Sequence, residues 1–192
     1  MKKWILFFLL LGVTLQGATR AQFNLSNLDL EAGIDFDVGQ LIESYGKDTY
    51  FIGAGFLTTN DGAGYQMVTA NVYMESEVSN FDAIRMGFGL KLVMTQVGAN
   101  SFLAVPVGMH VDYRVPNTNE LLLVTGKAYY APAPLSIGAA SSYIEGRIGV
   151  AVEPVENMRG FVEYRVIFTN FDAIVDPFLF NSTLYIGARV GF

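Results

Sequence analysis

The strongest constraint on this sequence is a strict alternation of apolar and polar side chains in segments of about ten to fourteen residues. In the segment 28–38, the charged side chains Asp29, Glu31, Asp35 and Asp37 share one parity, and apolar side chains occupy the other. A period of two places successive side chains on opposite faces of a β-strand. Nine such segments follow one another, most of them separated by turn-forming residues: 28–38, 49–58, 66–77, 83–95, 102–114, 121–131, 142–153, 159–171 and 183–192.

Strands with one charged and one apolar face fit two architectures. A soluble β-sandwich keeps the charged face in water, whereas a membrane β-barrel keeps it in the lumen. The segments are longer than typical soluble strands and match the length that crosses a bilayer at a tilt. Aromatic residues near the segment ends would form the interfacial girdles of a barrel. These residues include Tyr50, Tyr73, Tyr113, Tyr130, Tyr143 and Phe168.

Glycines on the charged parity, such as Gly87 and Gly108, also favour the barrel. On a solvated face, glycine would only weaken a strand. In a narrow lumen it would make room for long side chains. The side chains that we expect to need this room are those of Arg85, Lys91, Arg147, Arg165 and Arg189. We therefore predict an all-β, antiparallel, up-and-down transmembrane barrel.

The first residues predict a secretory signal. Lys2 and Lys3 precede an apolar run over 4–13, and small residues at Ala18 and Ala21 offer cleavage points. We expect cleavage after Ala21, so that residues 1–21 are removed and 22–192 form one barrel domain. The apolar run is too short to span a bilayer as a helix. A signal for export together with barrel strands predicts that the protein is located in the outer membrane of a Gram-negative cell.

Composition excludes other classes. The net charge of −6 would repel phosphate, so we expect no nucleic-acid partner. The chain has no Cys, which excludes disulfides, zinc–thiolate sites and a thiol nucleophile. We expect no cofactor and no metal. The acidic cluster in 28–38 is too dispersed along its strand for one Ca²⁺, and we expect it to pair with Arg and Lys of neighbouring strands instead.

Two stretches resemble known proteins. The final segment ends on Phe192 after Tyr185 and resembles the closing strand of bacterial outer-membrane barrels, whose terminal aromatic residue is part of the signal read by the assembly machinery. The stretch 127–136 resembles an element of the YfaZ-type family of outer-membrane proteins. The matching residues are Tyr129, Tyr130, Ala131, Pro132, Leu135 and Ser136. Tyr164-Arg165 matches a Tyr-Arg pair of that family, whereas Ala133 stands where the family more often has Glu.

The resemblance covers about 121–192 and implies location and fold, but no activity or catalytic residue. We expect about eight strands, or ten if the segment before Thr49 contributes two. A periplasmic C-terminus would put the connections 171–183, 131–141 and 60–64 outside the cell and the turns 154–158 and 116–120 inside. Pro106 cannot donate to a strand ladder, so it predicts a bulge.

The charged parity predicts a network of paired side chains that fills the lumen. Its members would be Arg85, Lys91, His110, Asp112, Arg114, Lys127, Glu145, Arg147, Glu163, Arg165 and Arg189. We therefore expect a barrel without enzymatic activity, with a role in envelope structure or surface contact. Its partners would be outer-membrane lipid, lipopolysaccharide and the barrel-assembly machinery. The apolar loop 170–181 could contact a further partner of unknown identity, or pack over the barrel mouth.

Three alternatives stay open at this stage. A ten-stranded barrel could leave a water path and act as a narrow channel. His110 and Asp112 lie two residues apart on one face and could form the His–Asp pair of a rim hydrolase, although the chain has no Gly-x-Ser-x-Gly turn. A secreted, soluble β-sandwich is the third alternative.

Overall fold

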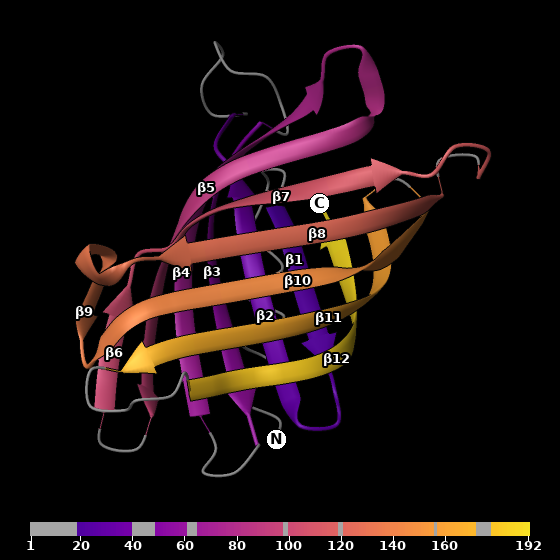
Figure 1. The fold of residues 1–192 in the computed structure, drawn as a ribbon. Helices are drawn as coiled ribbons and strands as arrows, with labels where there is room; N and C mark the ends of the chain where they lie inside the picture. The colour runs from indigo at the N-terminus through magenta and orange to yellow at the C-terminus, as the bar shows by residue number, and fades with distance from the viewer. Residues whose placement is uncertain are drawn as a thin grey trace.

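The chain forms a closed antiparallel β-barrel of ten strands (Figure 1). The computed structural model describes residues 19–39, 49–60, 65–97, 100–118, 121–155, 157–171 and 178–192. The ring runs β1-β2-β3-β4-β5-β7-β8-β10-β11-β12 and closes where β12 pairs with β1. Its strands are β1 (Thr19–Leu25), β2 (Asp29–Asp37), β3 (Tyr50–Thr59), β4 (Tyr65–Val78), β5 (Phe81–Val97), β7 (Val107–Arg114), β8 (Leu122–Ala131), β10 (Ala140–Val155), β11 (Met158–Phe171) and β12 (Phe178–Gly191).

The strand count confirms the ten-stranded alternative, because the segment before Thr49 contributes both β1 and β2. β1 begins at Thr19, inside the leader that we expect to be removed. Residues 1–18 of that leader lie outside the described residues. In Figure 1, the strands of the near wall cross those of the far wall, as the strands of a small, tilted barrel do.

The expected strand over 102–114 is interrupted at Pro106. β6 (Asn100–Ala104) pairs with the last part of β5, and β7 pairs with the middle of β5. The short helical turn η2 (Ala133–Leu135) and strand β9 (Ser136–Gly138) follow β8, and β9 pairs with β6. β6 and β9 therefore extend the sheet beyond the ring at one end, on the left in Figure 1.

The two ends of the barrel differ. β1 starts beside the end of β12, since Arg20 pairs with Gly191, and this end is named the terminal end. The strand directions place the connections 116–120 and 154–158 at the terminal end, and 60–64, 131–141 and 171–183 at the opposite end. This grouping is the one that the sequence predicts. Tight turns at the terminal end contain Asn80, Asn117 and Asn157 in the left-handed region, which asparagine tolerates better than most residues.

The burial of the two strand faces is the reverse of that in a soluble protein. The apolar side chains of the alternating pattern are exposed on the outer surface, with Ile148 at 64% and Leu184 at 63%. Charged side chains of the other parity are buried inside, with Arg165 at 1% and Glu145 at 2%. A closed ring with this burial excludes the soluble β-sandwich.

An apolar cluster fills the lumen at the opposite end. It joins buried side chains from seven ring strands and from β6, among them Leu57, Phe102, Tyr143, Phe171 and Phe180. A smaller cluster of Leu123, Ala151, Phe161 and Tyr185 lies nearer the terminal end. Charged side chains such as Glu145 and Arg147 occupy the space between these clusters, and others, such as Arg114, lie beside the smaller cluster.

Two aromatic residues do not lie in the girdles predicted from their positions near segment ends. Tyr143 is fully buried in the lumen, where its hydroxyl donates to Glu145 Oε2 at 2.7 Å, and Tyr73 lines the lumenal cavity described below. Parity explains the difference, because Tyr143 shares the lumenal parity of Glu145 and Tyr73 shares that of Glu75. Tyr130 is exposed on the outer face, as expected, while its neighbour Tyr129 is buried.

The lumenal glycines make room for different side chains than the cations predicted. Gly87 faces His110 in the strand register, and a Cβ at Gly87 would overlap the imidazole. Gly108 faces Tyr129 in the same way, and a Cβ there would overlap the phenol ring. Gly87 and Gly108 therefore accommodate rings on the adjacent strand. A cation reaches across the lumen, so its bulk lies away from the wall that carries it.

Within the described part of the chain, no helix is long and apolar enough to cross a bilayer.

Candidate functional site

A chain of ion pairs crosses the lumen from β2 to β5. Arg165 donates to Glu31 Oε2 at 2.6 Å and to Asp29 Oδ2 at 3.1 Å. Arg147 donates to Glu31 Oε1 at 2.8 Å and to Glu145 Oε1 at 2.7 Å. Lys91 then donates to Glu145 Oε2 at 2.7 Å. Acidic and basic residues alternate along this chain, so each buried charge has at least one opposite charge in contact.

The acidic cluster of the segment 28–38 thus pairs with Arg, as expected, but the partners are not on neighbouring strands. Asp29 and Glu31 belong to β2, whereas Arg165 belongs to β11, and β1 and β12 lie between them in the ring. The side chains meet because a narrow lumen brings opposite walls within the reach of an arginine. Among the described residues, no group of His, Asp and Glu could hold a metal ion.

A second group surrounds Glu75 on β4. Arg20 donates to both carboxylate oxygens of Glu75 at 3.1 Å, and its guanidinium lies 4.0 Å from the centre of the Phe51 ring. His110 Nε2 lies 3.1 Å from Glu75 Oε1. Arg20 belongs to the predicted leader, and cleavage after Ala21 would remove this cation from Glu75.

Three predicted network members lie toward the rim of the terminal end. Asp112 accepts from Arg159 at 2.6 Å, and Arg159 also contacts Glu153 at 2.6 Å. Arg85 and Arg114 both approach Glu77 Oε1, at 3.4 Å and 3.5 Å, where half of the Glu77 side chain is exposed. Arg85 and Arg114 are therefore rim residues in contact with solvent.

The remaining network members have no ion pair within 4 Å among the described residues. Glu163 accepts hydrogen bonds from the hydroxyls of Tyr185 and of Thr125, the latter at 3.0 Å. Arg189 donates to the neutral side chain of Gln22 at 2.8 and 3.2 Å. Lys127 lines the cavity and makes no hydrogen bond within the part of the chain that the structure describes. These three side chains therefore lie in a charged region of the lumen without a direct contact to an opposite charge among the described residues.

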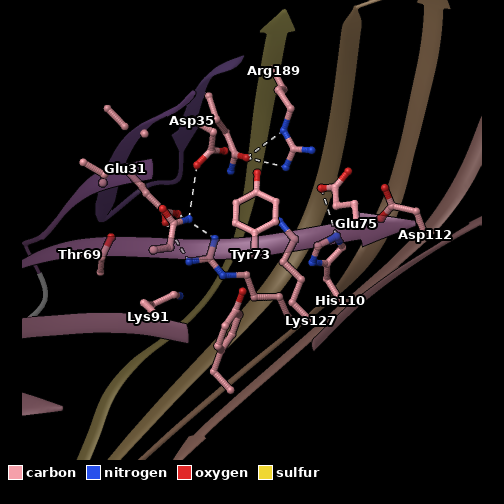
Figure 2. Close-up of a pocket in the computed structure, with 18 residues that line it drawn as sticks. Glu31, Asp35, Thr69, Tyr73, Glu75, Lys91, His110, Asp112, Lys127 and Arg189 are labelled. Carbon is pink, nitrogen blue, oxygen red and sulfur yellow. Dashed lines mark hydrogen bonds and ion pairs between the residues drawn. The ribbon is translucent and has the colours of Figure 1, made fainter. Parts of the chain in front are cut away.

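A polar cavity of about 110 Å³ lies within this network, in the half of the barrel nearer the terminal end (Figure 2). Its wall comes from nine ring strands and includes Asp35, Tyr73, His110, Lys127 and Arg189. Gly33 pairs with Gly55 across the β2–β3 wall, and the missing side chain of Gly33 leaves space there. A Cβ at Gly33 would meet only the carbonyl oxygen of Ala54, at 3.6 Å.

The His–Asp pair of the rim hydrolase alternative is not formed. His110 contacts Glu75, and Asp112 contacts Arg159. The cavity wall contains Thr69 and two tyrosines but no serine among the described residues. The sequence predictions also missed Glu75 and Tyr73. Both share the lumenal parity of Asn71, a signal that would have placed them in the barrel interior.

Comparison with known proteins extends the resemblance seen in the sequence. A search of the curated proteins found no match. A solved structure titled "Unveiling the Mechanism Behind the in-meso Crystallization of Membrane Proteins" has 9% sequence identity and a TM-score of 0.44. That alignment covers 92% of this chain and 83% of the other, and so low a similarity carries no functional argument. The model of the family described as "YfaZ precursor" matches residues 6–192, well beyond the C-terminal part in which the motifs occur. The chain therefore belongs to the YfaZ family.

Proposed function

We propose that this protein is an integral outer-membrane β-barrel whose filled lumen neither conducts nor catalyses, and which acts in envelope structure or surface contact. The observation that carries the proposal is the inverted burial, with apolar side chains exposed around the barrel and charged side chains inside it. Only a hydrocarbon solvent stabilises such an apolar outer surface. The precursor family and the predicted signal segment support export to that membrane.

The filled lumen supports the non-conducting part of the proposal. The apolar cluster around Phe102 and Phe171 occupies the opposite end, and two aromatic pairs within it have ring centroids 5.8 and 5.9 Å apart. The chain of ion pairs from Asp29 to Lys91 fills the middle. A hydrated ion would have to displace both layers, at a large cost in lost packing and ion pairing.

The contacts of His110 support the non-enzymatic part. A general base needs a free nitrogen directed at a nucleophile. The contact of His110 with Glu75 and the ion pair of Asp112 with Arg159 leave neither side chain placed to activate a serine. The proposed partners are consequently those of a passive barrel: outer-membrane lipid and lipopolysaccharide around the wall, and the barrel-assembly machinery during insertion.

The first experiment is heat-modifiability of the mature protein in SDS, comparing boiled and unboiled samples, together with cell fractionation. We expect a mobility shift on boiling and recovery in the outer-membrane fraction. Recovery in the periplasm or medium without a shift would contradict the proposal. Planar-bilayer recordings of the same preparation should stay silent over many insertions, and reproducible unitary currents would instead support the narrow channel.

A further inference from the structure

The lumenal cavity contains a set of charged and polar groups that the ion-pair network leaves unsatisfied. Eight charged side chains line the cavity, and five of them have an opposite charge within 4 Å: Glu31, Glu75, Lys91, Asp112 and Arg147. The other three are Asp35, Lys127 and Arg189. Among the described residues these three make no ion pair, although all three border the same space.

The unsatisfied groups include both hydrogen-bond donors and hydrogen-bond acceptors. Within the described ranges, Lys127 has no hydrogen-bond partner, and Arg189 donates only to the neutral amide of Gln22. On the acceptor side, Asp35 accepts from the Asn71 amide at 3.3 Å, and Asn71 Oδ1 is buried without any partner. Buried polar atoms normally find a partner in protein, water or ligand. The cavity therefore presents two cations for a carboxylate and two acceptors for a protonated amine.

The space has the size and position for a small solute. A cavity of about 110 Å³ is several times larger than a single water needs. Asp35 and Arg189 lie two residues from the ends of β2 and β12, at the terminal end of the barrel. The apolar cluster occupies the other end. A solute would therefore enter from the terminal end, which is the periplasmic side in the proposed orientation.

From these contacts we infer that the cavity is a binding site for a small zwitterion of the α-amino acid class. Lys127 and Arg189 bind its carboxylate, and Asp35 and Asn71 Oδ1 accept hydrogen bonds from its ammonium group. Figure 2 shows Asp35, Lys127 and Arg189 directed toward the cavity around Tyr73. The inference goes beyond a structural barrel and requires only that the barrel is folded.

Cleavage of the leader after Ala21 removes none of the charged side chains that line the cavity. Arg20 would be lost, but it pairs with Glu75 and does not line the cavity. The new α-amino group would be on Gln22, which does line the cavity. The positive charge of Arg20 would thus be lost, and a new one would appear on the adjacent lumenal residue of β1.

Isothermal titration of the mature, detergent-solubilised protein tests the site, with glycine as the probe and acetate and methylammonium as half-ligands. We expect glycine to bind at millimolar concentration or below, and each half-ligand at least about tenfold more weakly, because each satisfies only one side of the site. No heat with millimolar glycine would overturn the inference and leave the cavity to water. Acetate binding as tightly as glycine would also overturn it, in favour of a simple anion site.

Two variants localise the binding. Gly33→Val fills the cavity without removing any charge, and Lys127→Met removes one cation while keeping the length of the side chain. We expect Gly33→Val to abolish glycine binding and Lys127→Met to weaken it about tenfold or more. Gly126→Val is the matched control, because Gly126 lies on the outer face and a Cβ there meets nothing within 4 Å. Unchanged binding in Gly33→Val would place the site elsewhere.

The mobility shift on boiling is measured for every variant. A variant that shifts but does not bind glycine has lost the site and not the fold. A wild-type protein that fails to shift contradicts the proposed barrel itself, so the two failures can be told apart.

Discussion

Arg165 Nη1 lies 2.6 Å from Glu31 Oε2, although 134 residues separate them in the sequence and two strands separate them in the ring. Arg165 is the largest fully buried side chain in the described structure, and it also contacts Asp29 and Asn181. One arginine thus ties β11 to β2 and β12 through the lumen. The barrel wall is held by backbone hydrogen bonds, and this contact stabilises its interior.

We predict that Arg165→Met lowers the free energy of unfolding by about 3–5 kcal/mol, because it leaves Asp29 with no cation and Glu31 with only Arg147 in a buried space. Urea unfolding in detergent or lipid vesicles measures the change. Arg114→Met is the control. Arg114 makes a long contact with a half-exposed Glu77, and its loss should cost less than about 1 kcal/mol. Equal costs for both variants would contradict a buried network.

The parity of the sequence predicted which side chains enter the lumen, but not which ones meet there. Alternation depends on a single strand and can be read from neighbouring residues. The pairing of Arg165 with Glu31 depends on ring size, tilt and stagger, which only the closed barrel defines. The same limit explains why the sequence predicts the wrong partners for the glycines. Gly87 accommodates His110 because of the register between β5 and β7, and a single strand carries no information on register.

The strand count shows a different limit. β1 combines residues on both sides of Ala21, so the predicted cleavage point lies within a strand that pairs with β2 and β12. The alternation over 22–25 alone is too short to identify a strand. The tyrosines, in contrast, could have been placed correctly. Their parity was visible, and position near a segment end was the weaker signal.

Gly87→Val should prevent normal packing of the β5–β7 wall, because the new side chain would overlap the His110 imidazole. Forced overpacking of this kind costs about 1–3 kcal/mol. We expect a lower temperature for the mobility shift in SDS and a lower urea midpoint. The double variant Gly87→Val/His110→Ala should recover part of the loss, since it removes the overlap.

Gly126→Val is the matched control for that variant, because it adds the same atoms to the outer face. We expect little change in its urea midpoint. A similar loss for Gly126→Val, or no recovery in the double variant, would show that backbone preference and not the space occupied by His110 determines the effect.

Leader removal can be measured directly from the intact mass of the mature protein. We expect Gln22 to be the first residue, after cleavage at Ala21. In that protein Glu75 keeps His110 and, at 3.8 Å, Arg85 as its ionisable contacts, so His110→Leu should lower the urea midpoint more than it would in a protein that keeps Arg20. A mass that begins at Thr19 would contradict the prediction. It would make Arg20→Met the more damaging substitution, because the contact of Arg20 with both carboxylate oxygens would be lost.

Ile148→Arg tests whether the apolar outer surface is in contact with lipid. Ile148 is in the middle of β10 and is 64% exposed on the outer face, so the proposed orientation places it near the centre of the bilayer. An arginine at the bilayer midplane of a barrel costs about 2–4 kcal/mol, and the cost falls to about 0–1 kcal/mol near the interfaces. Val155 is similarly exposed but lies at the end of the same strand, which makes Val155→Arg the matched control. Unfolding in lipid vesicles should therefore show a clear loss for Ile148→Arg and a small one for Val155→Arg. If both arginines were equally well tolerated, the outer face of β10 would be in contact with water, and the proposed membrane location would be wrong.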